Sequence, residues 1–156
     1  MYAGSPCGRF FAKVNDMKKY VNFIASFKLI LKNQNKALIL TESNTGFVDL
    51  PGGRVEEHEI KLPIKELFKR EIEEELGKDV KYKVLKPAFQ YQRYDRFRKK
   101  AVLITAYEAE YLSGEIRLSE EHQRQEWINP QEFDFENRSF NNEGERAAFK
   151  EYFDKF

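Results

Sequence analysis

The chain has 156 residues, with 27 Lys and Arg against 26 Asp and Glu, so its formal net charge is +1. Its 41% hydrophobic and 34% charged residues are typical of a globular chain and too apolar for a disordered one. The charge argues against a nucleic-acid partner held by bulk positive charge, and no apolar run approaches the roughly 18 residues that span a membrane. Cys7 is the single cysteine, which excludes an intrachain disulfide and fits a cytoplasmic location.

The small net charge hides a segregation along the chain. Residues 54–77 carry five bases and eight acids, whereas residues 81–100 carry eight bases and one acid. Residues 101–156 are acidic again, with six bases and thirteen acids. An acidic segment therefore stands directly before a strongly basic one.

The first half of the chain is rich in predicted strands. Residues 21–31 and 37–40 predict two strands joined by a polar turn, and residues 47–50 predict a short third strand. Pro51, Gly52 and Gly53 end this third strand. A helix is predicted from Pro63 to Leu76, because apolar residues recur on one stripe and Gly77 fits the position after a helix end.

The second half predicts further strands at residues 80–85, 88–94, 101–111 and 125–129, and an amphipathic helix at residues 143–156. The phenylalanines of that helix are interpreted as core or dimer contacts. This order favours an α/β fold with a mixed sheet, in a single domain over residues 1–156. Residues 1–20 are expected to be an N-terminal extension that adds either a strand or a dimer contact, so a homodimer stays open.

Three glutamates of the central helix carry the strongest chemical signal. Glu71, Glu74 and Glu75 are spaced i, i+3 and i+4, which places them on one side of a helix. At roughly 100° per residue, Glu75 lies about 40° and Glu74 about 300° from Glu71, so all three are expected to face inward beside Leu67 and Phe68. Hard oxygen ligands at this spacing suit Mg²⁺ or Mn²⁺.

Two neighbouring features strengthen this metal-site hypothesis. Arg70 stands four residues before Glu74, close enough to pair with it and to hold its rotamer. Gly52 and Gly53 allow a close approach of the backbone, whose carbonyl groups can coordinate a metal beside the helix. The alternative interpretation of the acidic run is a charged surface helix, which is common in proteins.

The stretch from Gly53 to Gly77 resembles the Nudix box, G-x5-E-x7-R-E-U-x-E-E-x-G-U, where U is apolar. Glu59 stands six residues after Gly53, and residues 70–77 (REIEEELG) match every fixed position of R-E-U-x-E-E-x-G. The chain departs from the pattern in two places. Ten residues instead of seven separate Glu59 from Arg70, with the extra three expected around residues 60–62, and Lys78 takes the last apolar position.

The resemblance implies a Nudix-type α/β/α sandwich with one catalytic helix and a C-terminal helix. It implies Mg²⁺- or Mn²⁺-dependent hydrolysis of a diphosphate linkage in a nucleoside diphosphate derivative, a small nucleotide or nucleotide sugar. It further implies the following roles: metal ligands Gly52, Glu71, Glu74 and Glu75; orientation by Arg70; and a general base that is Glu71 or Glu75, or Glu120 or Glu121 of a later loop. His122 is interpreted as a loop histidine rather than a base.

The basic segment after the box interleaves bases with aromatic side chains. One interpretation is substrate recognition, with Arg93 and Arg96 on phosphates and Tyr94 on a base. The other is a half-buried hairpin with aromatic residues inward and bases in solvent.

Two further functions are weighed on the same residues. A non-catalytic nucleotide-sensing module on a Nudix scaffold is the main alternative, although the box carboxylates that such modules usually lose are present here. Isopentenyl diphosphate isomerase shares the fold, but it uses a core cysteine, whereas Cys7 lies in the N-terminal segment.

Overall fold

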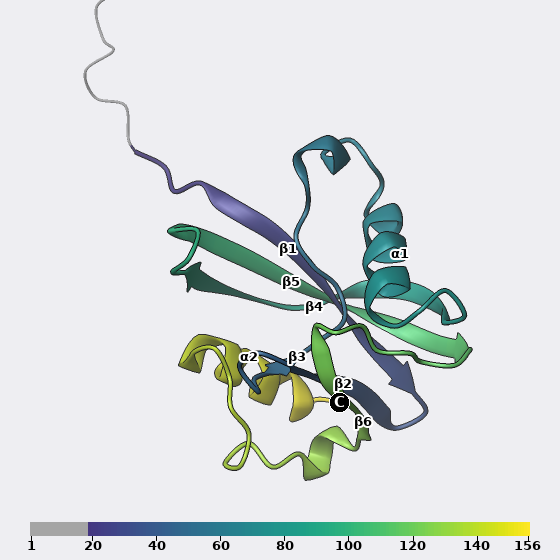
Figure 1. Ribbon diagram of the computed structural model, residues 1–156. Coiled ribbons are helices and arrows are strands. Elements are labelled where there is room, and N and C mark those ends of the chain that lie inside the picture. The colour runs from purple at the N-terminus through teal and green to yellow at the C-terminus, as the bar shows by residue number, and fades with distance from the viewer. Residues whose placement is uncertain (1–18) are drawn as a thin grey trace, which may run out of the picture.

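The computed structural model describes residues 19–156 and places a mixed β-sheet between two helices (Figure 1). Cys7 and most of the expected N-terminal extension lie outside these residues. The elements are β1 (Phe23–Asn33), β2 (Lys36–Glu42), β3 (Val48–Asp49), η1 (Glu57–Glu59), α1 (Ile64–Glu75), β4 (Lys81–Asp95), β5 (Lys100–Ser113), β6 (His122–Ile128), η2 (Pro130–Glu132) and α2 (Glu143–Phe153). No helix within residues 19–156 is long and apolar enough to cross a membrane.

The sheet is mixed because β1 pairs in opposite directions with its two neighbours. Its last residues pair antiparallel with β2 through the hairpin, whereas residues 23–32 pair in parallel with β5. The strand order is β3-β2-β1-β5-β4, and β6 adds to β2 in antiparallel register. The fold therefore matches the α/β sandwich with a mixed sheet that the sequence predicted.

Alternation along the central strands builds a core on each face of the sheet. Leu29 and Leu31 pack with the buried face of α1, while Ile30 between them packs on the opposite side with α2. The same alternation holds in β2. Because both faces are covered by a helix, the centres of these strands are continuous apolar runs, at residues 29–31 and 37–40, as is typical of a sheet buried on both sides.

The largest departures from the predicted strand bounds are in β4 and β6. The segments expected at residues 80–85 and 88–94 form one strand, β4, whose register shifts on both sides of Pro87. Proline lacks a backbone N–H, but β4 is the edge strand of the sheet, so the missing donor produces a bulge instead of a break. The predicted strand at residues 125–129 begins at His122, which corrects the interpretation of His122 as a loop residue.

The C-terminal helix α2 is fixed to the sheet by its aromatic face and by its first turn. Phe149 lies 5.2 Å from the Phe89 ring and 5.9 Å from the Phe153 ring, centroid to centroid. The buried Glu145 carboxylate accepts hydrogen bonds from the Tyr91 hydroxyl and the Asn141 N–H. Phe149 and Phe153 of this helix are core residues, which is one of the two alternatives that the sequence left open.

Truncation of Phe149 tests how much this helix contributes to stability. The side chain is 1% exposed, so Phe149→Ala should lower the free energy of unfolding by about 3–5 kcal/mol in urea denaturation. Phe97→Ala is the matched control, because Phe97 is 99% exposed and its loss should cost less than about 0.5 kcal/mol. Equal midpoints for the two variants would contradict the packing described.

Candidate active site

The loop after β3 lies against β1, and two glycines make this approach possible. The amide groups of Phe27 and Leu29 donate to the carbonyls of Gly53 and Pro51, at 2.9 and 2.7 Å. Gly52 has φ = +121°, and a Cβ there would collide with the Phe27 carbonyl oxygen. A Cβ on Gly53 would collide with the Glu71 carboxylate. The glycine pair therefore brings the backbone of β1 and the side chains of α1 together.

The α1 carboxylates are not equally buried. Glu75 is 4% exposed, and its Oε2 accepts a 2.7 Å hydrogen bond from the Gly52 N–H. The Glu71 side chain is 13% exposed, whereas that of Glu74 is 59% exposed. The expectation that all three face inward is wrong for Glu74, which lies at the solvent edge of the helix and pairs with Arg70 there.

Burial sets the electrostatics of these acids. It raises the pKa of Glu75 to about 7, although the nearby charge of Lys28 opposes the shift. Burial also raises the pKa of Glu71, against the opposing charge of Arg70. The surrounding protein therefore only partly compensates the ionised form of either carboxylate.

Arg70 connects the helix to the preceding loop. Its Nη1 contacts Glu74 at 3.2 Å, as the sequence predicted, but its shorter contacts are to Glu59 at 2.6 and 3.0 Å and to Glu71 at 2.8 Å. Glu59 is 2% exposed, and its hydrogen bonds from Arg70 lower its pKa in spite of burial. The role of Glu59 is therefore to fix the Arg70 guanidinium. Residues 60–62 form an exposed turn between η1 and α1.

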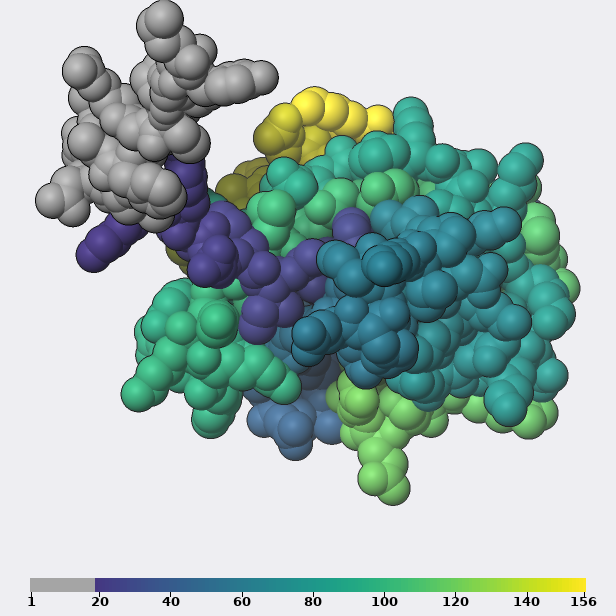
Figure 2. Space-filling model, turned by 90° about the horizontal axis from the view of Figure 1, so that it is seen from above, coloured from purple at the N-terminus to yellow at the C-terminus, as the bar shows by residue number. Residues whose placement is uncertain are grey.

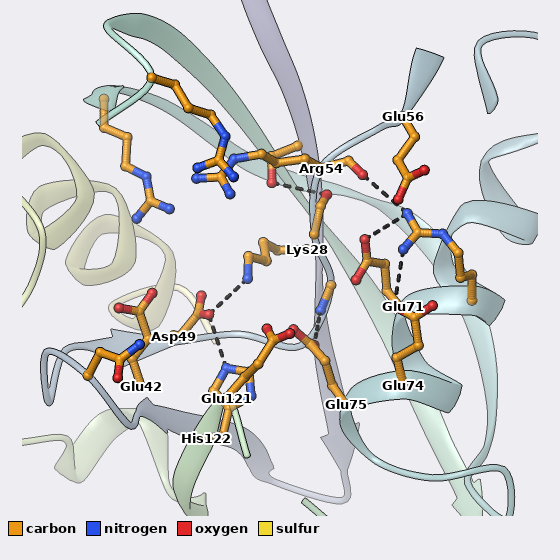
Figure 3. A pocket seen from close by; sticks show the side chains of 17 residues that line it. Lys28, Glu42, Asp49, Arg54, Glu56, Glu71, Glu74, Glu75, Glu121 and His122 are labelled. Carbon is orange, nitrogen blue, oxygen red and sulfur yellow. Dashed lines mark hydrogen bonds and ion pairs between the residues drawn. The ribbon is translucent and has the colours of Figure 1, made fainter. Parts of the chain in front are cut away.

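A buried cluster that the sequence did not indicate lies beside Glu75. Asp49 Oδ2 contacts Lys28 Nζ at 2.9 Å and His122 Nε2 at 3.2 Å (Figure 3). Burial alone would raise the pKa of Asp49, but the charge of Lys28 and the hydrogen bond from His122 lower it to about 2. The pKa values of Lys28 and His122 are both raised, because the attraction of Asp49 and Glu75 outweighs burial.

The only sequence signals for this cluster were single charged residues within apolar strands. Lys28 interrupts FIASFKLIL, and Asp49 stands between Val48 and Leu50. Neither signal tells which charges will meet. Their contact depends on the pairing of β1, β2, β3 and β6 in the sheet.

These groups line one cavity of about 620 Å³. Figure 2 shows the surface hollowed where the teal segment of the box, the blue turn after β2 and the light-green segment before β6 meet. The α1 carboxylates and the glycine pair form one wall, and the Lys28–Asp49–His122 cluster forms the floor. The opposite wall is basic and contains Arg54, Arg93 and Arg98. Acidic and basic side chains therefore face one space.

The structure separates the expected substrate-binding residues. Arg93 lines the cavity with the α1 carboxylates, and so does the expected base Glu121. Tyr94 and Arg96 instead line an adjacent cavity of about 660 Å³, which shares Arg54, Arg93 and Arg98 with the first. Sequence reasoning did not single out Arg54 or Arg98, although the basic composition of residues 81–100 pointed to the neighbourhood of Arg98.

The two interpretations of the basic segment each describe a part of it. Tyr91 is 8% exposed and packs toward α2, as the hairpin interpretation expected. Tyr94 and Phe97 are 61% and 99% exposed, near the tip of the β4–β5 hairpin. Tyr91 therefore belongs to the core, whereas the aromatic residues toward the hairpin tip are exposed to solvent.

The sequence of this chain matches a known family model, and its fold is similar to those of solved structures. The NUDIX domain profile matches residues 23–152. No curated protein sequence matches the chain. Among solved structures, the MutT protein from Methanosarcina mazei Go1 has a TM-score of 0.68 and 24% identity, over 88% of this chain and 97% of that one. The E. coli ORF135 protein has a TM-score of 0.67 and 20% identity, over 86% and 91%.

An ADP-ribose pyrophosphatase from Streptococcus suis 89-1591 is also similar in structure, with a TM-score of 0.58 and 17% identity over 83% of this chain and 90% of that one. At these identities the neighbours establish the fold, while the profile covers most of the chain and includes the whole box. The chain belongs to the Nudix family.

Proposed function

We propose that this Nudix pyrophosphohydrolase cleaves a diphosphate linkage in a nucleoside diphosphate derivative, with a divalent metal ion as cofactor. The observation that carries the proposal is the burial of Glu75, next to Glu71, in a cavity whose opposite wall is basic. A buried carboxylate costs free energy unless a cation compensates it. A metal bound to a polyphosphate supplies that compensation and brings the substrate with it.

The donor groups fit Mg²⁺ or Mn²⁺. Within residues 19–156, no three or more acidic, histidine or cysteine side chains are gathered closely enough to hold a metal ion by themselves. Mg²⁺ usually takes one or two carboxylates and completes its shell with water and substrate phosphate, so an open set suits it. Glu71 and Glu75 would hold it, with Glu74 at the solvent side. The Gly52 carbonyl would join them, because the Gly53 carbonyl already accepts from Phe27 and Ser26.

The bound metal would supply charge neutralisation at the phosphate oxygens and acidify a water molecule. The protein's own residues orient the catalytic groups and deprotonate the attacking water. Arg70, held by Glu59, fixes the Glu71 carboxylate, and Gly52 N–H fixes Glu75. A carboxylate that lines the cavity takes the proton of the attacking water. The water oxygen bonds to phosphorus, the bridging P–O bond breaks, and its electron pair leaves on the departing phosphate.

Three acids are candidates for that general base. Glu75 has a pKa of about 7, which lies close to the value at which a base is most effective near neutral pH. Glu71 is the second box candidate, and Glu121 approaches from the loop before β6. Comparison of the three Gln variants in the full pH–rate profile identifies the base, because loss of the base removes the acidic limb.

Glu75→Gln tests the assignment of the site. The variant removes an oxygen ligand and a candidate base, so hydrolysis should fall by about a hundredfold or more. Its thermal stability should not decrease, because burial already disfavours the lost charge. Glu73→Gln on the same helix is the control, since Glu73 does not line this cavity, and it should retain wild-type rates.

The assay is chromatographic detection of hydrolysis products, with Mg²⁺ or Mn²⁺, from nucleoside triphosphates, ADP-ribose, NADH, diadenosine polyphosphates and capped RNA. Unchanged metal-dependent rates in Glu75→Gln would refute the assigned site. Wild-type protein that binds nucleotides without turning over any of them would instead indicate a sensing module.

Gly53→Ala tests the contact between the loop and the helix. The added Cβ would occupy the position of the Glu71 carboxylate, so the variant should move Glu71 and lower turnover by roughly ten- to a hundredfold. Gly144→Ala in α2 is the matched control, because its Cβ meets only the Asn142 side chain at 3.2 Å. Wild-type kinetics for Gly53→Ala would show that Glu71 needs no fixed position.

A further inference from the structure

Three arginines gather at the junction of the two cavities. Arg54 follows the glycine pair, Arg93 lies near the end of β4, and Arg98 belongs to the turn between β4 and β5. All three line both the cavity of the α1 carboxylates and the adjacent cavity of Tyr94 and Arg96. Any group that extends from one cavity into the other must pass their guanidinium groups.

One carboxylate holds two of these guanidinium groups together. Asp95 Oδ2 contacts Arg54 Nη2 at 2.9 Å and Arg98 Nη1 at 3.1 Å, and Asp95 Oδ1 accepts from the Arg98 backbone N–H at 2.9 Å. The Asp95 side chain is only 7% exposed. It therefore fixes the hairpin turn to the box loop and sets the positions of both arginines.

The cluster has more positive charge and more donors than its own acids use. Asp95 forms ion pairs with two of the guanidinium groups. Glu42 is the acid that lines both cavities together with the three arginines. Arg93 makes no ion pair within residues 19–156. Arg54 Nε is buried and has no acceptor among the same residues. That nitrogen is closed to solvent, but an anion with several oxygens in the cavities would satisfy the arginine donors that remain open to them.

We propose that Arg54, Arg93 and Arg98 form a second phosphate site, which selects substrates with a phosphate beyond the diphosphate held at the α1 carboxylates. This inference rests on the function proposed above and narrows it to linear polyphosphates, such as nucleoside triphosphates. A nucleotide sugar places a neutral ring where the third phosphate would lie, and it would leave the arginine donors without acceptors.

The charges of the two walls support this division of the substrate. Metal-bound phosphates are expected at the acidic wall, where a cation lies between the anions. A phosphate without its own metal needs cationic donors, and guanidinium groups match its geometry. The neighbouring arginines repel one another, so an anion among them gains more than it would beside a single arginine.

Steady-state kinetics with Mg²⁺ test the proposal. The substrates are a nucleoside triphosphate and a nucleotide sugar with the same base, and the variants are Arg93→Gln, Arg98→Gln and Asp95→Asn. We expect KM for the triphosphate to rise about tenfold in each arginine variant, the size of one lost charge-assisted hydrogen bond, with kcat nearly unchanged. KM for the nucleotide sugar should rise much less, because the sugar offers no third phosphate to these donors. Arg117→Gln is the control, because Arg117 is an exposed arginine outside both cavities.

Asp95→Asn separates positioning from direct contact. The variant leaves all three arginines in place but weakens the hold on Arg54 and Arg98, so its loss should appear with the triphosphate and not with the sugar. Thermal unfolding of each variant shows whether the hairpin stays folded. Equal losses for both substrates would overturn the proposal, as would a preference for the sugar in the wild-type protein.

A metal-free titration makes the result independent of turnover. Inorganic tripolyphosphate should bind the wild-type protein in EDTA more tightly than pyrophosphate does, and Arg98→Gln should lose about tenfold in affinity by calorimetry. Binding with no hydrolysis of any nucleotide would overturn the proposed function and leave the arginine site standing. Hydrolysis of triphosphates with no effect of the arginine variants in either assay would overturn the arginine site alone.

Discussion

The closeness of α1 to the loop after β3 is the constraint on which the rest of the site depends. Side chains at positions 52 and 53 would occupy the space of the Phe27 carbonyl and the Glu71 carboxylate. Because neither position has a Cβ, the loop can accept hydrogen bonds from the backbone of β1 on one side. On the other side, the Gly52 N–H donates a hydrogen bond to the Glu75 carboxylate. Strand, loop and helix thus meet within hydrogen-bonding distance, and the cavity opens at this meeting point.

Burial at this point has an electrostatic consequence that Lys28 partly offsets. Its ammonium group pairs with Asp49, and its charge also acts on Glu75. Asp49 in turn holds His122, so the floor of the cavity has fixed charges and a fixed shape. Breaking such a buried pair leaves an uncompensated charge, which is strongly destabilising. The floor therefore serves the fold and the site together, whereas the carboxylates above it remain undercompensated and available to a cation.

Much of the fold and one wall of the site could be predicted from the sequence, because both depend on local patterns. Helical spacing placed Glu71 and Glu75 beside the core, and the glycines marked the close approach. The same spacing failed for Glu74, since an angle near the margin of the buried stripe does not decide between core and solvent. Arg70 lies one turn earlier and is held at Glu59, so it keeps Glu74 at the exposed edge.

The parts that the sequence missed depend on contacts between distant segments. Lys28, Asp49 and His122 come from three strands, and their meeting requires the pairing of β2 with β3 and β6 as well as with β1. Arg54 and Arg98 likewise meet through Asp95, far from Arg54 in the chain. Each of these residues is unremarkable in its own segment, so no local pattern could have paired them.

The basic segment shows why composition alone could not locate the second wall. Its bases are spread over a strand of 15 residues and the turn that follows, and at about 3.3 Å per residue the two ends of the strand lie far apart. Lys81, Lys83 and Lys86 are exposed along the first half of this edge strand, where charged side chains hinder edge-to-edge association. The arginines follow at its far end, beside the glycine loop. The acidic helix and the basic segment are neighbours in sequence, but of that segment only Arg93 and Arg98 line the cavity of the carboxylates.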